Sequence, residues 1–144
     1  MPTVREIIAH KGPAVVTVSP DSTVLEAAQL MNARGIGAVL VMEGRELLGI
    51  FTERDIMRRV VAEQRDPATT RVREVMTTTL VTTHADAPMA ECAALMTTRR
   101  IRHLPVLGPD GLSGVITTGD LMAFQVADQA VTIAQLNSYV YDTR

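Results

Sequence analysis

Two threonine–aspartate pairs carry the most evident chemistry in this sequence. Thr52 and Asp55 lie in the string GIFTERD at residues 49–55, and Thr117 and Asp120 hold the same places in GVITTGD at residues 114–120. An ionised aspartate only accepts hydrogen bonds, so its two oxygens can hold the hydroxyls of a vicinal diol such as ribose. A helix that begins beside the threonine adds unpaired N–H groups that suit a phosphate. Each pair therefore has the parts of a nucleotide site.

The same spacing has a simpler interpretation. Thr-x-x-Asp at a helix start resembles the capping box, in which the side chains satisfy N–H groups of the first turn. Short motifs of this kind also arise without any ligand. A single copy would favour the capping interpretation, whereas two copies with their strands intact favour a binding role. Periodicity does not name the ligand.

Both pairs belong to an internal repeat. Asp120 follows Asp55 by 120 − 55 = 65 residues, the same offset relates Gly49 to Gly114, and the copies align without a gap from Val16 onward. Before that point, the pattern at residues 4–8 returns at residues 72–76. The predicted organisation is a first repeat over 1–64, a linker over 65–71, a second repeat over 72–127 and a helical extension over 128–144.

Hydrophobic periodicity predicts one order of elements in both repeats. In the first repeat, residues 14–18 are β-branched and strand-like, and a helix opens at Thr23, with Glu26 at capping-box spacing. Strands over 36–42 and 47–51 flank a turn, and a helix follows Thr52. The fold class is therefore α/β (α+β), with two β-α-β-β-α units.

Composition restricts the partners. The chain has 144 residues, 47% of them hydrophobic, which is enough for a core, and a net charge of −2 argues against a nucleic-acid partner. Aromatic residues make up 3%, so base-stacking surfaces are not expected. The single Cys92 fits a helix core position and a reducing compartment. With no signal peptide or long apolar run, the sequence predicts a cytoplasmic protein without a membrane partner.

The repeated pattern resembles a known family. The β-α-β-β-α order, the Gly-apolar-apolar-Thr-x-x-Asp endings and the string RRIRHLPV at residues 99–106 are similar to the tandem cystathionine-β-synthase (CBS) domain pair, or Bateman module. The resemblance covers residues 4 to about 126 and is greatest for short stand-alone bacterial pairs. It implies two repeats packed about a pseudo-two-fold axis, with a C-terminal helix added.

The resemblance also implies two clefts that bind adenosine-containing ligands, each cleft shared between the repeats. The aspartate would hold the ribose, and strands of the other repeat would contact the adenine. The first cleft would contain Val115, Thr117 and Asp120 with Val15, Val16, Thr17, Ile36 and Gly37. The second cleft would contain Thr52, Arg54 and Asp55 with Leu80, Val81, Thr82, Ile101, Arg102 and His103.

Side-chain charge predicts that these clefts differ. Arg54, Arg102 and a protonated His103 would favour a more highly phosphorylated ligand in the second cleft, with binding that tightens as pH falls. Their counterparts in the first cleft are Gly119, Gly37 and Ala38, which carry no charge. The alternative for His103 is a strand residue satisfied by a carbonyl, and for Arg102 a solvated position.

The functional prediction is a sensor rather than an enzyme. The sequence has no recognisable nucleophile, metal-ligand or Walker motif, and no cofactor is expected to be obligatory. The predicted function is regulatory signal transduction, in which AMP, ADP, ATP or NAD binds as ligand and an unknown effector protein reads the result. The alternative is a constitutive dimerisation or scaffold module with non-functional clefts.

The C-terminal region predicts an oligomer. An apolar stripe at near-helical spacing follows the second repeat, and such a stripe needs a covering surface. Its members are Val126, Ala130, Ile133, Leu136 and Val140. Packing within the same chain is one solution. A homodimer is the other and is the expectation here.

Overall fold

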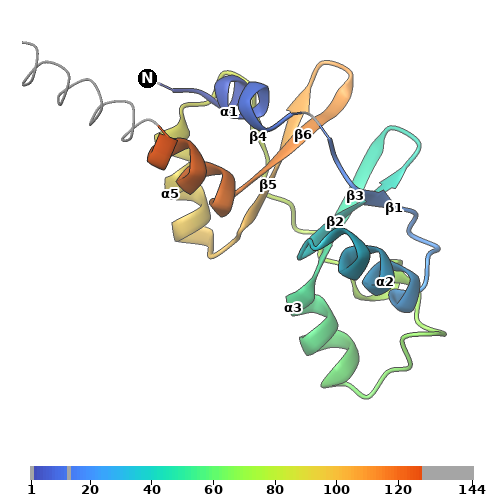
Figure 1. Cartoon of the computed structure of the whole chain (residues 1–144). Helices are drawn as coiled ribbons and strands as arrows, with labels where there is room; N and C mark the ends of the chain where they lie inside the picture. The colour runs from blue at the N-terminus through green and yellow to red at the C-terminus, as the bar shows by residue number, and fades with distance from the viewer. Residues whose placement is uncertain (1, 13, 128–144) are drawn as a thin grey trace, which may run out of the picture.

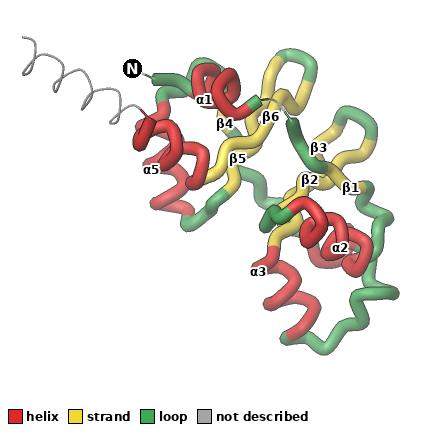
Figure 2. The backbone as a smooth tube through the Cα atoms, viewed as in Figure 1, coloured by secondary structure: helices red, strands yellow, loops and turns green. Residues whose placement is uncertain are grey.

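The computed structural model describes residues 2–12 and 14–127. These residues form two three-stranded sheets, each accompanied by helices (Figures 1 and 2). The predicted extension over 128–144 lies outside the described residues. The helix that follows the last strand occupies 118–127, at the end of the described chain.

The first sheet has the order β1-β2-β3, in which β1 and β2 are parallel and β2 and β3 are antiparallel. A short α-helix and a π-helix follow it directly. The elements in chain order are β1 (Thr17–Val18), α2 (Val24–Arg34), β2 (Ala38–Glu43), β3 (Glu46–Thr52), α3 (Glu53–Asp55) and η1 (Ile56–Val61).

The second sheet repeats this topology as β4-β5-β6. Its elements are β4 (Thr83–His84), α5 (Met89–Arg99), β5 (His103–Gly108) and β6 (Gly111–Thr117). The predicted α+β fold of two β-α-β-β-α repeats is confirmed. The predicted cap of α2 is also present, since the Thr23 hydroxyl accepts a hydrogen bond from the Glu26 amide at 3.1 Å.

Each half is completed by a helix from the start of the other repeat. Helix α1 (Val4–Lys11) places Val4 and Ile7 in the core of the second half, where Ile7 is 1% exposed. Helix α4 (Val72–Val75) places its two valines in the core of the first half. Figure 1 shows α1 beside β4 and β6 rather than beside the first sheet.

Because of this exchange, each folded half contains one helix from the other sequence repeat. The Val4 amide donates to the Ala87 carbonyl at 3.0 Å, and the Val72 amide donates to the Ser22 carbonyl at 2.8 Å. The chain therefore passes between the halves once after α1, which ends at Lys11, and again at 76–82, between α4 and β4. Residues 65–71, predicted as the linker, precede the second of these crossings. Both crossings contribute to the functional site.

Candidate functional site

Both threonine–aspartate pairs form capping boxes. The Thr117 amide donates to Asp120 Oδ2 at 2.8 Å, and the Asp120 amide donates to Thr117 Oγ1 at 3.0 Å. The corresponding distances for Thr52 and Asp55 are 3.0 Å and 3.2 Å. The capping interpretation therefore holds in both copies. It also fixes each carboxylate at a strand end, where one oxygen remains for another partner.

A cavity of about 140 Å³ lies between the two halves at the end of β6. The structure brings Val16, Ile36, Val115 and Thr117 together in its wall, four of the residues assigned to the first cleft. Val15, Thr17 and Gly37 are neighbours in sequence of these wall residues. The remaining lining residues are Lys11, Ala14, Ala38, Val39, Leu40, Ile50 and His103.

Lys11 joins this cavity to Asp120. Its ammonium donates to Asp120 Oδ2 at 2.7 Å and to the Val115 carbonyl at 2.8 Å. The two charged side chains are 24% and 21% exposed, so solvent screens the pair only partly. The expectation that the first cleft has no cation is wrong. Lys11 has no part in the repeated motif, because it lies at the end of α1, which packs on the second half.

His103 lies in the Asp120 cavity and not with Arg102. Neighbouring residues of an extended chain point in opposite directions, which separates these two side chains. Burial lowers the pKa of His103, and the positive charges of Lys11 and Arg102 lower it further, against smaller opposing effects of Asp120 and Glu53. The assignment of His103 to the Asp55 cleft therefore needs correction. The lowered pKa favours the uncharged imidazole.

Asp55 is enclosed by the second crossing. The Thr77 hydroxyl donates to Asp55 Oδ1 at 3.0 Å, and Thr77 exchanges two backbone hydrogen bonds with Ile50 at 2.9 and 3.0 Å. Arg59 Nε lies 3.8 Å from the same oxygen, and Asp55 is 6% exposed. Sequence comparison missed Thr77, because its role depends on how the chain crosses between the halves.

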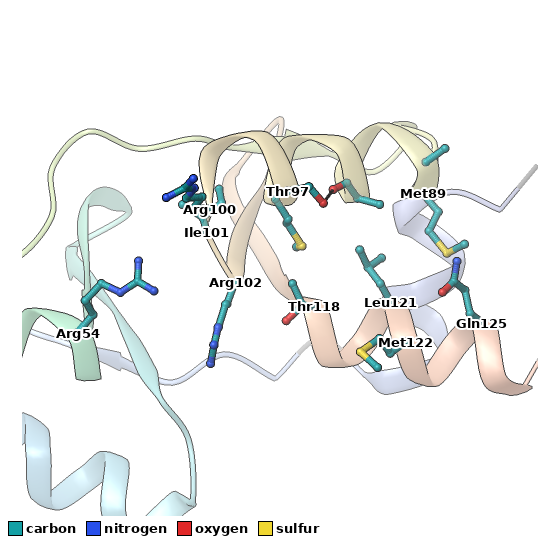
Figure 3. Close-up of a pocket in the computed structure, with 13 residues that line it drawn as sticks. Arg54, Met89, Thr97, Arg100, Ile101, Arg102, Thr118, Leu121, Met122 and Gln125 are labelled. Carbon is teal, nitrogen blue, oxygen red and sulfur yellow. Dashed lines mark hydrogen bonds between the residues drawn. The ribbon is translucent and has the colours of Figure 1, made fainter.

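The remaining residues of the second cleft are divided between two places. Leu80, Val81 and Thr82 are half-buried in the second crossing. Arg54, Ile101 and Arg102 line a separate groove of about 560 Å³ beside α5 and the helix at 118–127 (Figure 3). Neither Thr52 nor Asp55 lines this groove.

The groove has a basic end and an apolar end. Figure 3 shows Arg54, Arg100 and Arg102 toward one end, with Leu121 further along between the two helices and Met122 on the helix at 118–127. Met122 is 64% exposed. Arginines beside an apolar surface can bind an acidic partner or a second protein surface.

Within the described residues, no cluster of three or more metal-ligating side chains is present. None of the described helices combines the length and apolar character needed to cross a membrane. Cys92 is a buried core residue, as predicted, and burial raises the pKa of its thiol.

Comparisons with known proteins agree with the architecture. The chain is 38% identical over 123 residues to the CBS domain-containing protein YhcV of Bacillus subtilis (strain 168), covering 85% of this chain and 87% of that protein. It superposes with a TM-score of 0.85 on a CBS-domain protein from Burkholderia ambifaria MC40-6, at 42% identity, covering 89% of this chain and 96% of that chain.

A third similar structure shares the fold alone. It is the CBS domain pair of MJ0100 in complex with 5-methylthioadenosine and S-adenosyl-L-methionine, with 22% identity, a TM-score of 0.78 and coverage of 89% of this chain and 98% of that one. The family model of the CBS domain matches this sequence twice, at residues 4–62 and 72–127. The two sheets, the repeated capping boxes and these matches show that the chain belongs to the CBS domain family, as a tandem pair.

Proposed function

We propose that this protein is a ligand-sensing regulatory module that binds an adenosine-containing nucleotide, such as AMP, ATP or NAD, in the cavity beside Asp120. The observation that supports it best is the meeting of Val16 and Ile36 from the first repeat with Thr117 from the second. Apolar strand residues suit a base, whereas a carboxylate and a helix N-terminus suit a ribose phosphate. Asp120 does not itself line the cavity, but Lys11 and Thr117, which do, both hydrogen-bond to its carboxylate or amide.

The family supports the ligand class. CBS domain pairs are regulatory modules, and the MJ0100 pair of the same fold was crystallised with two adenosine ligands. On this proposal, Asp120 receives the ribose hydroxyls and the wall from the first repeat contacts the base. The Asp55 cleft is the weaker candidate, because both oxygens of Asp55 accept hydrogen bonds from the chain, whereas in the described residues only Oδ2 of Asp120 does so.

The module is proposed to be non-catalytic and to act through a partner. Ligand bound between the halves changes their relative stability or orientation. An effector protein, or the other subunit of a homodimer, responds to this change. A cytoplasmic location is part of the proposal. The alternative is a scaffold in which the CBS fold serves dimerisation and the cavity binds nothing.

A thermal-shift panel separates these functions. AMP, ADP, ATP and NAD are tested against the unmodified protein, since a ligand that binds only the folded state stabilises it by about 2.7 kcal/mol at a hundredfold excess over Kd. The Asp120→Ala variant should lose the shift, and Asp110→Ala, which removes an exposed carboxylate from the β5–β6 turn, should keep it. A protein whose melting temperature does not change with any of these nucleotides, but which remains dimeric, would support the scaffold function.

A further inference from the structure

Lys11 is the only lysine in the sequence, and every other basic residue except histidine is an arginine. It is the last residue of α1 and reaches the second half, where its ammonium contacts Asp120 Oδ2 and the Val115 carbonyl. At Asp55 the cation is different: Arg59 Nε lies 3.8 Å from Oδ1, which also accepts from the Thr77 hydroxyl, and the capping-box oxygen Oδ2 accepts only from Thr52 among the described residues. The single lysine thus lies at the carboxylate that is proposed to bind ribose.

We propose that Lys11 determines ligand specificity by exchanging partners, pairing with Asp120 in the unliganded protein and with a ligand phosphate once ribose occupies Asp120. This inference rests on the proposed function. It predicts a cleft that selects phosphorylated adenosine compounds over adenosine itself.

The exchange follows from the number of acceptor positions on Asp120. Oδ2 already accepts hydrogen bonds from the Thr117 amide and from Lys11. A vicinal diol that binds in a bidentate manner needs both carboxylate oxygens, so it competes with the ammonium for Oδ2. The amide of Thr117 belongs to the capping box and is held by the backbone. Lys11, on a flexible side chain, is the group that can leave.

The displaced ammonium then needs a new anion. It keeps the Val115 carbonyl, but a partly buried charge without a counter-ion is unfavourable. The other charged or titratable groups near this cavity are His103, Arg102 and Glu53, and their effects on the pKa of His103 place them within electrostatic range. The lowered pKa of His103 favours the neutral imidazole, Arg102 repels a cation, and the carboxylate of Glu53 forms no ion pair with Lys11 in the described part of the chain. A ligand phosphate supplies the missing charge, whereas adenosine leaves it unmet.

The first test compares AMP with adenosine by calorimetry. The unmodified protein should bind AMP at least about tenfold more tightly, the effect of one sheltered charge-assisted hydrogen bond. Lys11→Met should lose this preference through weaker AMP binding, with adenosine binding unchanged or tighter. Lys11→Arg should retain the preference. Arg5→Met is the matched control, because Arg5 lies on the same helix and pairs with Asp86 at the surface.

The second test observes the amine directly. Reductive methylation with ¹³C-formaldehyde labels only the α-amino group and Lys11, which gives one lysine signal by NMR. AMP should move this signal and change its titration midpoint. A saturating concentration of adenosine, which has no phosphate, should not change the midpoint in the same way.

The outcomes separate the two proposals. If neither AMP nor adenosine binds the unmodified protein, the proposed function fails and this inference fails with it. If both bind but Lys11→Met keeps the unmodified AMP-to-adenosine ratio, or AMP leaves the lysine signal unmoved, partner exchange is overturned while adenosine binding stands.

Discussion

Thr77 donates its hydroxyl to Asp55 Oδ1 at 3.0 Å, whereas in the other copy Lys11 donates its ammonium to Asp120 Oδ2 at 2.7 Å. The repeat makes the two aspartates equivalent, but the two crossings of the chain bring different partners to them. Asp120 is paired with the Lys11 ammonium, whereas Asp55 accepts from the hydroxyl of Thr77, on a backbone segment paired with Ile50, and lies 3.8 Å from Arg59 Nε. The two aspartates therefore have different roles.

Asp55→Ala should reduce the free energy of unfolding. It removes one half of a capping box and the acceptor for the Thr77 hydroxyl at a site that is 6% exposed. We expect a loss of about 1 to 3 kcal/mol in urea unfolding. Thr77→Val should lose less, because the capping box remains. Equal stability of Asp55→Ala and the unmodified protein would show that the capping box and the Thr77 hydrogen bond do not contribute to the free energy of unfolding.

Ile7→Ala tests the helix exchange. Ile7 is 1% exposed in the core of the second half, so its truncation should cost about 2 to 5 kcal/mol. Hydrogen exchange should then accelerate mainly in β5 and β6. The matched variant Val75→Ala, from α4, should affect β2 and β3 instead. Faster exchange in β2 and β3 for Ile7→Ala would contradict the exchanged arrangement.

His103 should make stability dependent on pH. Its pKa in the folded protein is below the ordinary value of about 6.5, so the unfolded chain binds a proton more readily. Stability is therefore greatest above that value and falls as pH decreases from about 6.5 toward the folded pKa. His103→Gln should flatten this part of the profile in urea unfolding, and His84→Gln, at an exposed position, should not.

The same residue predicts how pH affects ligand binding. A phosphate near His103 raises its pKa, so the bound complex takes up a proton and AMP binding tightens as pH falls through the range below about 6.5. Adenosine lacks the phosphate and should show a smaller dependence. Calorimetry at two pH values on the unmodified protein and His103→Gln measures this; the same pH dependence in both proteins would exclude His103.

The helix at 118–127 should contribute to a homodimer. Met122 and Val126 are 64% and 63% exposed, and Met122 borders the apolar part of the groove in Figure 3. Met122→Glu, or truncation after Ala127, should halve the mass measured by light scattering. A variant that keeps the dimer mass after truncation would restrict residues 128–144 to contacts within one chain.

The sequence by itself determined the repeat, the order of elements and the capping boxes, because each depends on residues close together in the chain. Periodicity, a threonine before a helix and an aspartate three positions later act over one or two turns. They also sufficed to bring Val16, Ile36 and Thr117 into one proposed cleft through the family resemblance.

Only the tertiary structure decided which groups contact the two aspartates. Comparison of the repeats matches residues to their counterparts, whereas Lys11 reaches Asp120 from the end of α1 and Thr77 reaches Asp55 from the segment after α4. The same holds for His103 and Arg102, which are adjacent in sequence but line different spaces. Local patterns carry no information about such contacts, because α1 and α4 gain their burial in the opposite halves of the molecule.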